Sequence, residues 1–451
     1  MKKRITGVIA TVCMFAFILS GCGGTQSTQN TPPAATEKSG TATKAGNADS
    51  STETSKPAES PQQDQIPKEI TVMVPPWAEP TADDLKAFKE KTGISAKMNI
   101  VGWDEIRDKI SIAAVSKTAP ADVVEVDWSW VGEFNSSGWV EPIKLKDEDI
   151  KDMPTLSSFT VGDNILGVPY ANDFRIGFFN KEHFSRAGLS KPPTSWDELV
   201  DYCKRIQKAG VAKYPFGLTL SATESTTTSL IWLTLARSGD FFNADGSLNR
   251  ENVLSSLKFI KEAVAVHKII DPASATMKDE EIGKAFLNGS SSMLVFSTGY
   301  LSLINNEKES KIVNKGEAML IPGNERVETA SFALPEALGV TKYSKNKEAA
   351  LKFIEWYTGP DMQVSLNASQ GTLPTRISVL KKCIDGGQLT GGDIMLKQAA
   401  SVKSPFPKGI PTWYPEMSTT VYNSVNQMVL GQLTPEKAVE AIDAKIKELS
   451  K

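Results

Sequence analysis

Residues 164–188, NILGVPYANDFRIGFFNKEHFSRAG, carry the pattern from which the rest of the architecture follows. Residues 170–180 alternate and then end in an apolar run, which predicts a buried strand. Side chains repeat every two residues along a strand, so Asp173 and Arg175 share one face with Ala171. A carboxylate and a guanidinium on such a face need partners. Two interpretations stay open: the groups pair with each other or with a neighbouring element, or the face lines a cleft.

A helix is predicted directly downstream, over residues 195–209. Ser195 and Glu198 have the S-x-x-E spacing of a capping box, in which each side chain bonds a free backbone N–H of the first turn. Gly210 is suited to end the helix, because glycine adopts the left-handed conformation of a C-terminal cap. A strand followed by a well-delimited helix indicates an α/β protein.

Three motifs in this region resemble those of one family. They are G-V-P-Y-x-x-D at 167–173, F-N-K-x-x-F-x-x-A-G at 179–188 and P-P-T-S-W-D-E-L at 192–199. Together they resemble the extracellular solute-binding proteins of ABC importers, most closely the branch that takes up oligosaccharides. The resemblance implies an α/β, periplasmic-binding-protein-like fold of two lobes, with mixed sheets flanked by helices and a ligand cleft between the lobes.

The N-terminus has the pattern of a processed lipoprotein. Lys2, Lys3 and Arg4 precede an apolar run, residues 5–19, that is too short to span a bilayer and leads into Leu-Ser-Gly-Cys. This predicts a signal peptide over 1–21 and a lipid group on Cys22, with fatty acyl chains such as palmitate. The alternative is an ordinary signal peptide with an incidental cysteine. Residues 23–65 lack apolar periodicity, which predicts a disordered tether to the outer face of the cell membrane.

The remaining chain is long enough for two lobes. The resemblance implies a first lobe over 66–172 and 333–451, including the C-terminal helices, and a second lobe over 173–332. It also implies that the lobes are joined by hinges at 171–177 and 332–340. The chain is expected to be a monomer that works with permease subunits and a separate ATPase, because no phosphate-binding G-x-x-x-x-G-K-[ST] motif is present.

Charge and cysteine content exclude several classes of function. The formal charge is −3 and becomes more negative once the basic signal segment is removed, so a nucleic-acid partner is not expected. Cys203 and Cys383 lie far apart in helix-like segments and are interpreted as lone thiols. No metal-ligand spacing is present, and no cofactor is predicted.

The first lobe predicts where a ligand binds. Strands at 69–75, 94–101 and 120–127 alternate with helices at 81–93 and 103–117, which is the signature of a parallel sheet. Ligands bind at the carboxyl ends of such strands. The candidate residues there are Trp77, Asp127, Trp128 and Trp130, whereas Trp103 is interpreted as a contact at a helix start.

Aromatic side chains in loops favour a carbohydrate ligand, because a sugar ring stacks on an aromatic face while its hydroxyls bond to polar groups. Tyr300, Trp413 and Tyr414 extend the candidate set, and Trp232 is assigned to the core or to the cleft with equal weight. The resemblance implies that Asp173 is a carboxylate ligand on the first crossover. It also implies that Tyr300 lies near the place of a stacking tryptophan in the oligosaccharide branch.

Two alternatives to sugar binding stay open. A non-sugar polar solute, such as a polyol phosphate, would suit the same fold. Asp127 and Asp173 could also form the carboxylate pair of a glycoside-cleaving enzyme. No other signature of catalysis accompanies them, so the protein is predicted not to be an enzyme. Which sugar binds, and with what length and linkage, is not indicated.

Overall fold

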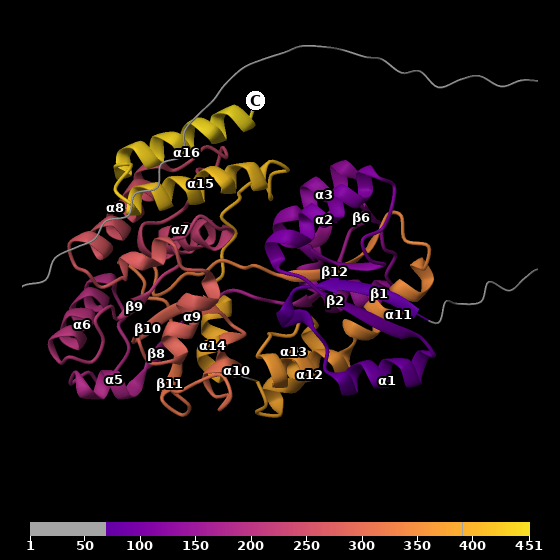
Figure 1. The fold of residues 1–451 in the computed structure, drawn as a ribbon, viewed down its shortest axis with the longest axis horizontal. Helices are drawn as coiled ribbons and strands as arrows, with labels where there is room; N and C mark the ends of the chain where they lie inside the picture. Colours follow the sequence, from indigo (N-terminus) through magenta and orange to yellow (C-terminus); the bar gives the residue numbers. More distant parts are fainter. Residues whose placement is uncertain (1–68, 390) are drawn as a thin grey trace, which may run out of the picture. The chain divides into compact units, whose positions relative to one another are not determined.

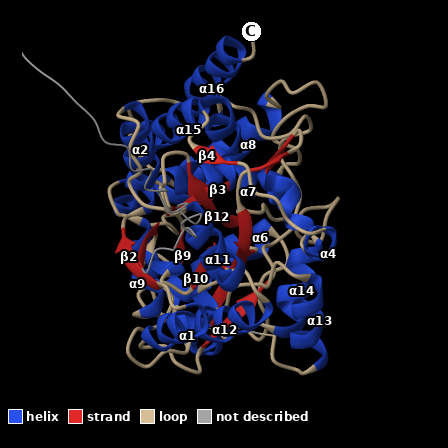
Figure 2. Cartoon of the chain, turned by 90° about the vertical axis from the view of Figure 1, so that its right-hand side faces the viewer, coloured by secondary structure: helices blue, strands red, loops and turns tan. Residues whose placement is uncertain are grey.

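The computed structural model describes residues 69–389 and 391–451 (Figure 1). The predicted signal peptide, Cys22 and the predicted tether lie outside the described residues. Within the described part, helices surround a six-stranded sheet, a four-stranded sheet and a two-stranded hairpin. Figure 2 colours the strands red and the helices blue. The predicted α/β class is therefore confirmed. None of the helices in this part of the chain is long and apolar enough to cross a membrane.

The first sheet has six strands in the order β2-β1-β3-β12-β4, with β7 also paired to β12. β1, β2 and β3 run parallel, whereas β12 runs antiparallel to β3 because it belongs to the returning chain. The strands are β1 (Glu69–Val74), β2 (Ser95–Ile100), β3 (Val123–Asp127), β4 (Val140–Glu141), β7 (Val168–Ala171) and β12 (Glu336–Thr341). A short hairpin of β5 (Thr160–Val161) and β6 (Asn164–Ile165) lies outside this sheet.

Local signals place the helices of the first lobe. Helix α1 begins after Thr81, whose hydroxyl accepts from the N–H of Asp84 in a capping box, and ends at Gly93 in the left-handed conformation. The other helices are α2 (Trp103–Val115), α3 (Val131–Ser137), α4 (Asp147–Asp152), α11 (Lys347–Tyr357), α12 (Pro360–Gln370) and α13 (Ile377–Asp385), while α1 spans Ala82–Thr92.

The second sheet is organised around β8 (Arg175–Asn180). This strand is buried from Ile176 onward, which confirms the predicted buried strand. It pairs antiparallel with both β10 (Met293–Ser297) and β11 (Gly316–Met319). The short β9 (Phe216–Gly217) completes the sheet, parallel to β10.

Six helices of the second lobe lie between β8 and β12 in the sequence. They are α5 (Lys181–Arg186), α6 (Trp196–Lys208), α7 (Glu224–Arg237), α8 (Arg250–Ala265), α9 (Asp279–Leu287) and α10 (Tyr300–Ile304). The Ser195 side chain caps α6 as predicted. The carboxylate of Glu198, however, accepts from the backbone and hydroxyl of Thr194 rather than from the N–H of Ser195, so the predicted capping box is only half correct.

The C-terminal helices do not belong to the lobe to which the sequence assigned them. Helices α15 (Tyr414–Val429) and α16 (Pro435–Leu449) pack against α7 and α8, and α14 (Gly392–Ala400) packs against β11 (Figure 1). The side-chain amide of Asn426 also bonds the carbonyls of Leu220 and Ala275. Placing all of 333–451 in the first lobe was therefore wrong for these helices, because an apolar helix face does not specify its partner.

The chain consequently passes between the lobes three times. It crosses between β7 and β8, returns before β12, and crosses again between α13 and α14. The first two crossings lie side by side, since Phe174 bridges to Ala333 and the N–H of Leu334 bonds the carbonyl of Asp173. These two segments overlap the predicted hinges at 171–177 and 332–340.

Candidate interlobe binding site

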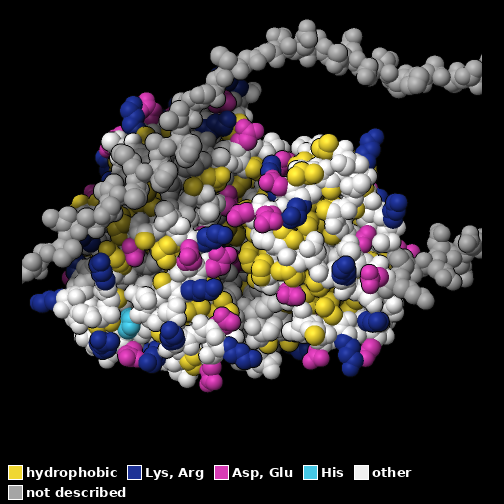
Figure 3. Space-filling view, viewed as in Figure 1, with side chains coloured by type: hydrophobic (Ala, Val, Ile, Leu, Met, Phe, Trp, Pro, Cys, Tyr) yellow, Lys and Arg dark blue, Asp and Glu magenta, His cyan; other side chains and the backbone are white. Residues whose placement is uncertain are grey.

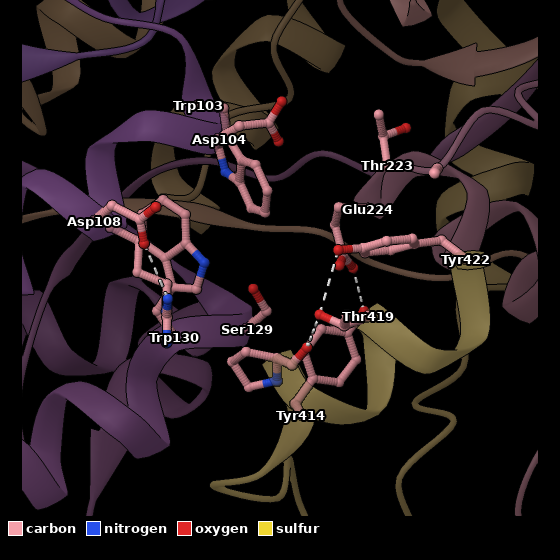
Figure 4. Close-up of a pocket in the computed structure, with 13 residues that line it drawn as sticks. Trp103, Asp104, Asp108, Ser129, Trp130, Thr223, Glu224, Tyr414, Thr419 and Tyr422 are labelled. Carbon is pink, nitrogen blue, oxygen red and sulfur yellow. Dashed lines mark hydrogen bonds and ion pairs between the residues drawn. The ribbon is translucent and has the colours of Figure 1, made fainter. Parts of the chain in front are cut away.

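A cavity of about 280 Å³ lies between the two lobes and takes its walls from four elements (Figure 4). Helix α2 and the 3-10 turn η2 (Trp128–Trp130) form the first-lobe wall. The start of α7 and the start of α15 form the opposite wall. The lining residues are Trp103, Asp104, Arg107, Asp108, Ser129, Trp130, Ala222, Thr223, Glu224, Tyr414, Pro415, Thr419 and Tyr422.

Asp127 fixes the first-lobe wall. It ends β3 and accepts from the backbone and hydroxyl of Ser129, the middle residue of η2. Its other oxygen accepts from the indole N–H of Trp103, 3.1 Å away, at the start of α2. Burial raises the pKa of Asp127 to about 6. Asp127 was predicted to contact the ligand, but its carboxylate is buried and holds η2 against α2 instead.

Two indoles form the aromatic surface of this wall. The rings of Trp103 and Trp130 lie 4.9 Å apart between centroids, and Trp130 also stacks on Phe134. Both tryptophans line the cavity. The sequence analysis selected Trp130 but assigned Trp103 to a helix contact. The sequence did contain a signal for Trp103, because this residue is at the start of a helix that follows the end of a strand.

Glu224 is the central polar group of the opposite wall. It is the first residue of α7, and one of its oxygens accepts from the hydroxyl of Tyr414 on α15 (Figure 4). The other oxygen accepts from the hydroxyl of Ser418, also on α15. Burial raises the pKa of Glu224 to about 8, and the nearby Asp127 and Asp104 add to this effect. The sequence analysis did not select Glu224, because it lies in a Ser- and Thr-rich segment with no motif.

Carboxylates dominate the charge around the cavity. The guanidinium of Arg107 forms two bonds of 2.6 and 2.7 Å with Glu133 and a third contact of 3.2 Å with Asp108. The pKa of Asp104 is raised by burial and by Glu280, which faces it from the second lobe. Figure 3 shows acidic side chains, in magenta, gathered in the middle of the face between the two lobes.

The family follows from a sequence comparison. The family model described as bacterial extracellular solute-binding protein matches residues 72–364. The chain belongs to this family. The resemblance inferred from the motifs at 167–199 is thereby confirmed.

Individual relatives differ in the solute that their names report. A probable amino-acid ABC transporter periplasmic-binding protein of Sinorhizobium fredii is 23% identical over 384 residues, 80% of this chain and 83% of its own. Maltose-bound MalE3 of T. maritima has a TM-score of 0.75 and 22% identity, covering 84% of this chain and 99% of its own. A solute-binding protein of Thermotoga lettingae with α-D-tagatose has a TM-score of 0.75 and 25% identity, covering 85% and 100%. The two structures confirm the two-lobed fold.

In this solute-binding protein, the carboxylate of Asp173 bonds to other residues of the protein itself. One oxygen accepts from the hydroxyl of Ser297 and from the N–H and hydroxyl of Thr298, each at 2.9 Å. The other oxygen pairs with Arg175 at 3.0 Å. The first of the two interpretations, mutual pairing, therefore describes this face. Asp173 holds the first crossover against the end of β10 and does not line the cavity.

Trp128 and Trp232 were predicted to contact the ligand, and both are buried in packing. Trp128 is 3% exposed and contacts the rings of Phe332 and Tyr414 at 5.0 and 4.9 Å. Trp232 is 1% exposed and stacks on Trp196 inside the second lobe. Neither ring offers a face to the cavity, because neighbouring elements cover both. Both assignments to the ligand site stay predictions, and neither residue lines the cavity.

The remaining candidates lie outside the cavity lining. Trp77 is 42% exposed after β1 and donates to Glu336 at 2.8 Å. Trp413 is partly buried at the start of α15. Tyr300 packs on Phe296, with ring centroids 4.5 Å apart, and its hydroxyl occupies the space where a side chain at Gly283 would lie. Of the predicted ligand residues, only Trp130 and Tyr414 line the cavity.

A group of buried carboxyls lies behind Trp77. The hydroxyl of Tyr170 is 2.9 Å from Glu336 and 3.1 Å from the fully buried Glu125. A hydroxyl has one proton to donate, so one of the two carboxyls must be protonated to complete both bonds. Burial raises the pKa of Glu125 well above its usual range and that of Glu336 to about 8.

The described residues give little support for metal binding or catalysis. Residues 69–389 and 391–451 contain no group of three or more His, Cys, Asp or Glu side chains that could hold a metal ion. Cys203 and Cys383 are free and buried, and burial raises the pKa of Cys203. Asp127 and Asp173 are both occupied by internal hydrogen bonds and therefore do not form an open catalytic pair.

Proposed function

We propose that the protein captures a sugar or oligosaccharide in the interlobe cavity and delivers it to the permease of an ABC importer. The cavity itself carries this proposal, because aromatic rings and carboxylates from both lobes converge on it. Trp103 and Trp130 offer faces suited to the apolar side of a sugar ring. Ser129, Glu224 and Thr419 are placed to bond hydroxyl groups. The maltose- and tagatose-bound structures of the same fold support this ligand class.

Closure of the two lobes is the proposed mechanism. A solute that touches α2 and η2 on one side and α7 and α15 on the other makes all its contacts only when the lobes approach. Binding then shifts the open–closed equilibrium by the difference in affinity between the two states. The paired crossovers at 171–177 and 332–340 are the proposed hinges, and the permease would recognise the closed form.

Membrane attachment is proposed from the sequence at Cys22. Lipidation there would hold the folded lobes at the outer face of the cell membrane, with residues 23–65 as tether. The Cys22→Ala variant should appear in the medium with unchanged melting temperature. A variant that still sediments with membranes would contradict this assignment.

A panel of solutes tests the proposed function. Sugars and oligosaccharides of different linkage, amino acids and polyol phosphates are added separately while the melting temperature is followed, since a bound ligand stabilises the folded state. A rise with a sugar, without cleavage products, supports the proposal. A rise with an amino acid alone would favour the second candidate, a non-sugar polar solute, which the Sinorhizobium fredii relative supports. Cleavage products would instead indicate an enzyme.

A further inference from the structure

We infer that the solute carries a protonated amine, so that the cavity selects an amino sugar over its neutral counterpart and over an anionic one. This inference rests on the proposed function and adds the charge of the ligand to it. It is drawn from three observations: the balance of charge in the lining, the acceptors left without a partner, and the placement of the aromatic rings.

The lining has an excess of negative charge. Three carboxyl groups, Asp104, Asp108 and Glu224, face the cavity, and Arg107 is the one basic side chain among the lining residues. Arg107 does not offset this excess, because its guanidinium is already bonded to Asp108 and to Glu133 behind the wall. None of the lining residues therefore offers an anionic solute a cation that is not already paired.

Several carboxylate oxygens lack a protein donor. Asp104 accepts no hydrogen bond and forms no ion pair with the described residues, and Lys278 is the nearby cation that lowers its pKa. One oxygen of Asp279, at the start of α9, is buried without a hydrogen-bond partner, while the other accepts from Ser225 beside Glu224. Asp104 lines the cavity, whereas Asp279 is not among the lining residues, so a charged donor from the solute would satisfy the carboxylate of Asp104.

Aromatic rings enclose the same space. Trp103 and Trp130 lie on one side, and Tyr414 and Tyr422 lie on the other (Figure 4). An ammonium group gains from the negative face of such rings as well as from carboxylates, and the gain grows when water is excluded. A hydroxyl at the same place has one proton to donate and no charge. An ammonium group has three protons and a charge, so it fits the carboxylates and the rings together.

The carboxyl groups of the cleft also hold protons that a cationic ligand would replace. Burial raises the pKa of Glu224, and Asp127 and Asp104 raise it further. Tyr414 faces Glu224 from α15 and donates to it. Burial raises the pKa of Asp279 to about 6, the bond from Ser225 and the charge of Arg175 oppose this rise, and Glu280 and Asp104 add smaller contributions to it. A positive charge between these groups would relieve their repulsion, whereas a neutral sugar would not.

Matched sugars test this inference. Glucose, glucosamine, N-acetylglucosamine and glucose 6-phosphate form one set, and cellobiose, its glucosamine disaccharide and chitobiose form a second. Binding of each to the full chain is measured by calorimetric titration at one pH and one salt concentration. We expect the amine to bind on the order of tenfold or more tightly than the hydroxyl counterpart, and the phosphate to bind more weakly than either.

Two variants connect the selectivity to the cavity. Glu224→Gln and Asp104→Asn should each reduce the ratio of amine to hydroxyl affinity, with a smaller change for the neutral sugar. Although its carboxyl is partly desolvated at the cavity, Asp104 makes no hydrogen bond or ion pair with the described residues, so its substitution should leave the melting temperature of the free protein unchanged. Glu317→Gln on β11 serves as the control, because Glu317 pairs with Lys181 on the surface, away from the cavity.

The outcomes separate this inference from the proposed function. Equal or tighter binding of the hydroxyl or acetamido sugars, or tightest binding of the phosphate, would overturn the inference and leave a solute-binding protein for sugars. An unchanged amine preference in both cavity variants would also overturn it. If no member of the extended sugar panel binds, the proposal of a sugar ligand fails and the inference fails with it.

Discussion

Trp128 and Trp130 occupy the same short 3-10 turn and are equally buried, at 3% exposed, yet they face different regions. Trp128 points into an aromatic cluster with Phe332, Phe406 and Tyr414, where the return crossover and the loop before α15 meet the first lobe. Trp130 lies on the cavity wall beside Trp103. The comparison shows that exposure in one conformation does not identify a ligand residue, whereas the neighbours of the ring do.

The largest expected effect concerns the cluster around Trp128. Trp128→Ala removes a buried ring that contacts three elements, so we expect a loss of about 3–5 kcal/mol in the free energy of unfolding. Chemical denaturation monitored by circular dichroism measures this loss. Per folded molecule, ligand affinity should change far less than stability. A variant with normal stability and strongly reduced affinity would return Trp128 to the ligand-binding set.

The second prediction concerns Trp130, where we expect ligand affinity rather than stability to be the main quantity that changes. Trp130→Ala removes one face of the cavity, and truncating a stacking tryptophan in a binding centre typically costs about 2 kcal/mol or more of binding free energy, roughly a thirtyfold loss of affinity. The ring also packs on Phe134, so some loss of stability accompanies it. Trp130→Phe serves as the control, since it keeps an aromatic face. Unchanged affinity in Trp130→Ala would exclude this wall as the binding surface.

A third prediction concerns Asp173, which lies on the first crossover between the lobes and not in the cavity lining. Asp173 accepts three hydrogen bonds and one ion pair within the protein, so Asp173→Asn should lower stability by about 1–3 kcal/mol. Ligand affinity per folded molecule should stay nearly unchanged, because Asp173 does not line the cavity. Melting of the free protein and calorimetric titration on the same variant measure both quantities. A stable variant with weakened binding would support the ligand role that the sequence implied.

Local patterns predicted the fold well, since the strand at 175–180, the cap at Ser195 and the helix over 196–208 all depend on near neighbours in sequence. The cavity, in contrast, depends on residues that are distant from each other in the sequence. Glu224 meets Tyr414 across 190 residues, and only the packing of α15 on α7 brings them together. The rule that ligands bind at strand ends located the right region in the first lobe. It could not separate Trp128 from Trp130, because the turn directs these two rings to different regions.

The smallest effect on stability at neutral pH concerns the proton that Glu125 and Glu336 share beside Trp77. The folded protein holds a proton between Glu125 and Glu336 that the unfolded chain releases near pH 4.5, so this pair makes the folded state bind more protons. Its contribution to stability is fully present below about pH 4.5 and is lost as the pH rises towards about 8, the pKa of Glu336 in the folded state.

Glu125→Gln tests this assignment, because an amide donates to Tyr170 at every pH and needs no shared proton. We expect the dependence of unfolding free energy on pH between 5 and 8 to become shallower, by up to about 1.4 kcal/mol per pH unit for one proton. Denaturation at a series of pH values measures it. Glu317→Gln, at the exposed position of β11, should leave the slope unchanged. Equal slopes in Glu125→Gln and the unmodified protein would show that the pair shares no proton, and that Trp77 is held by Glu336 alone.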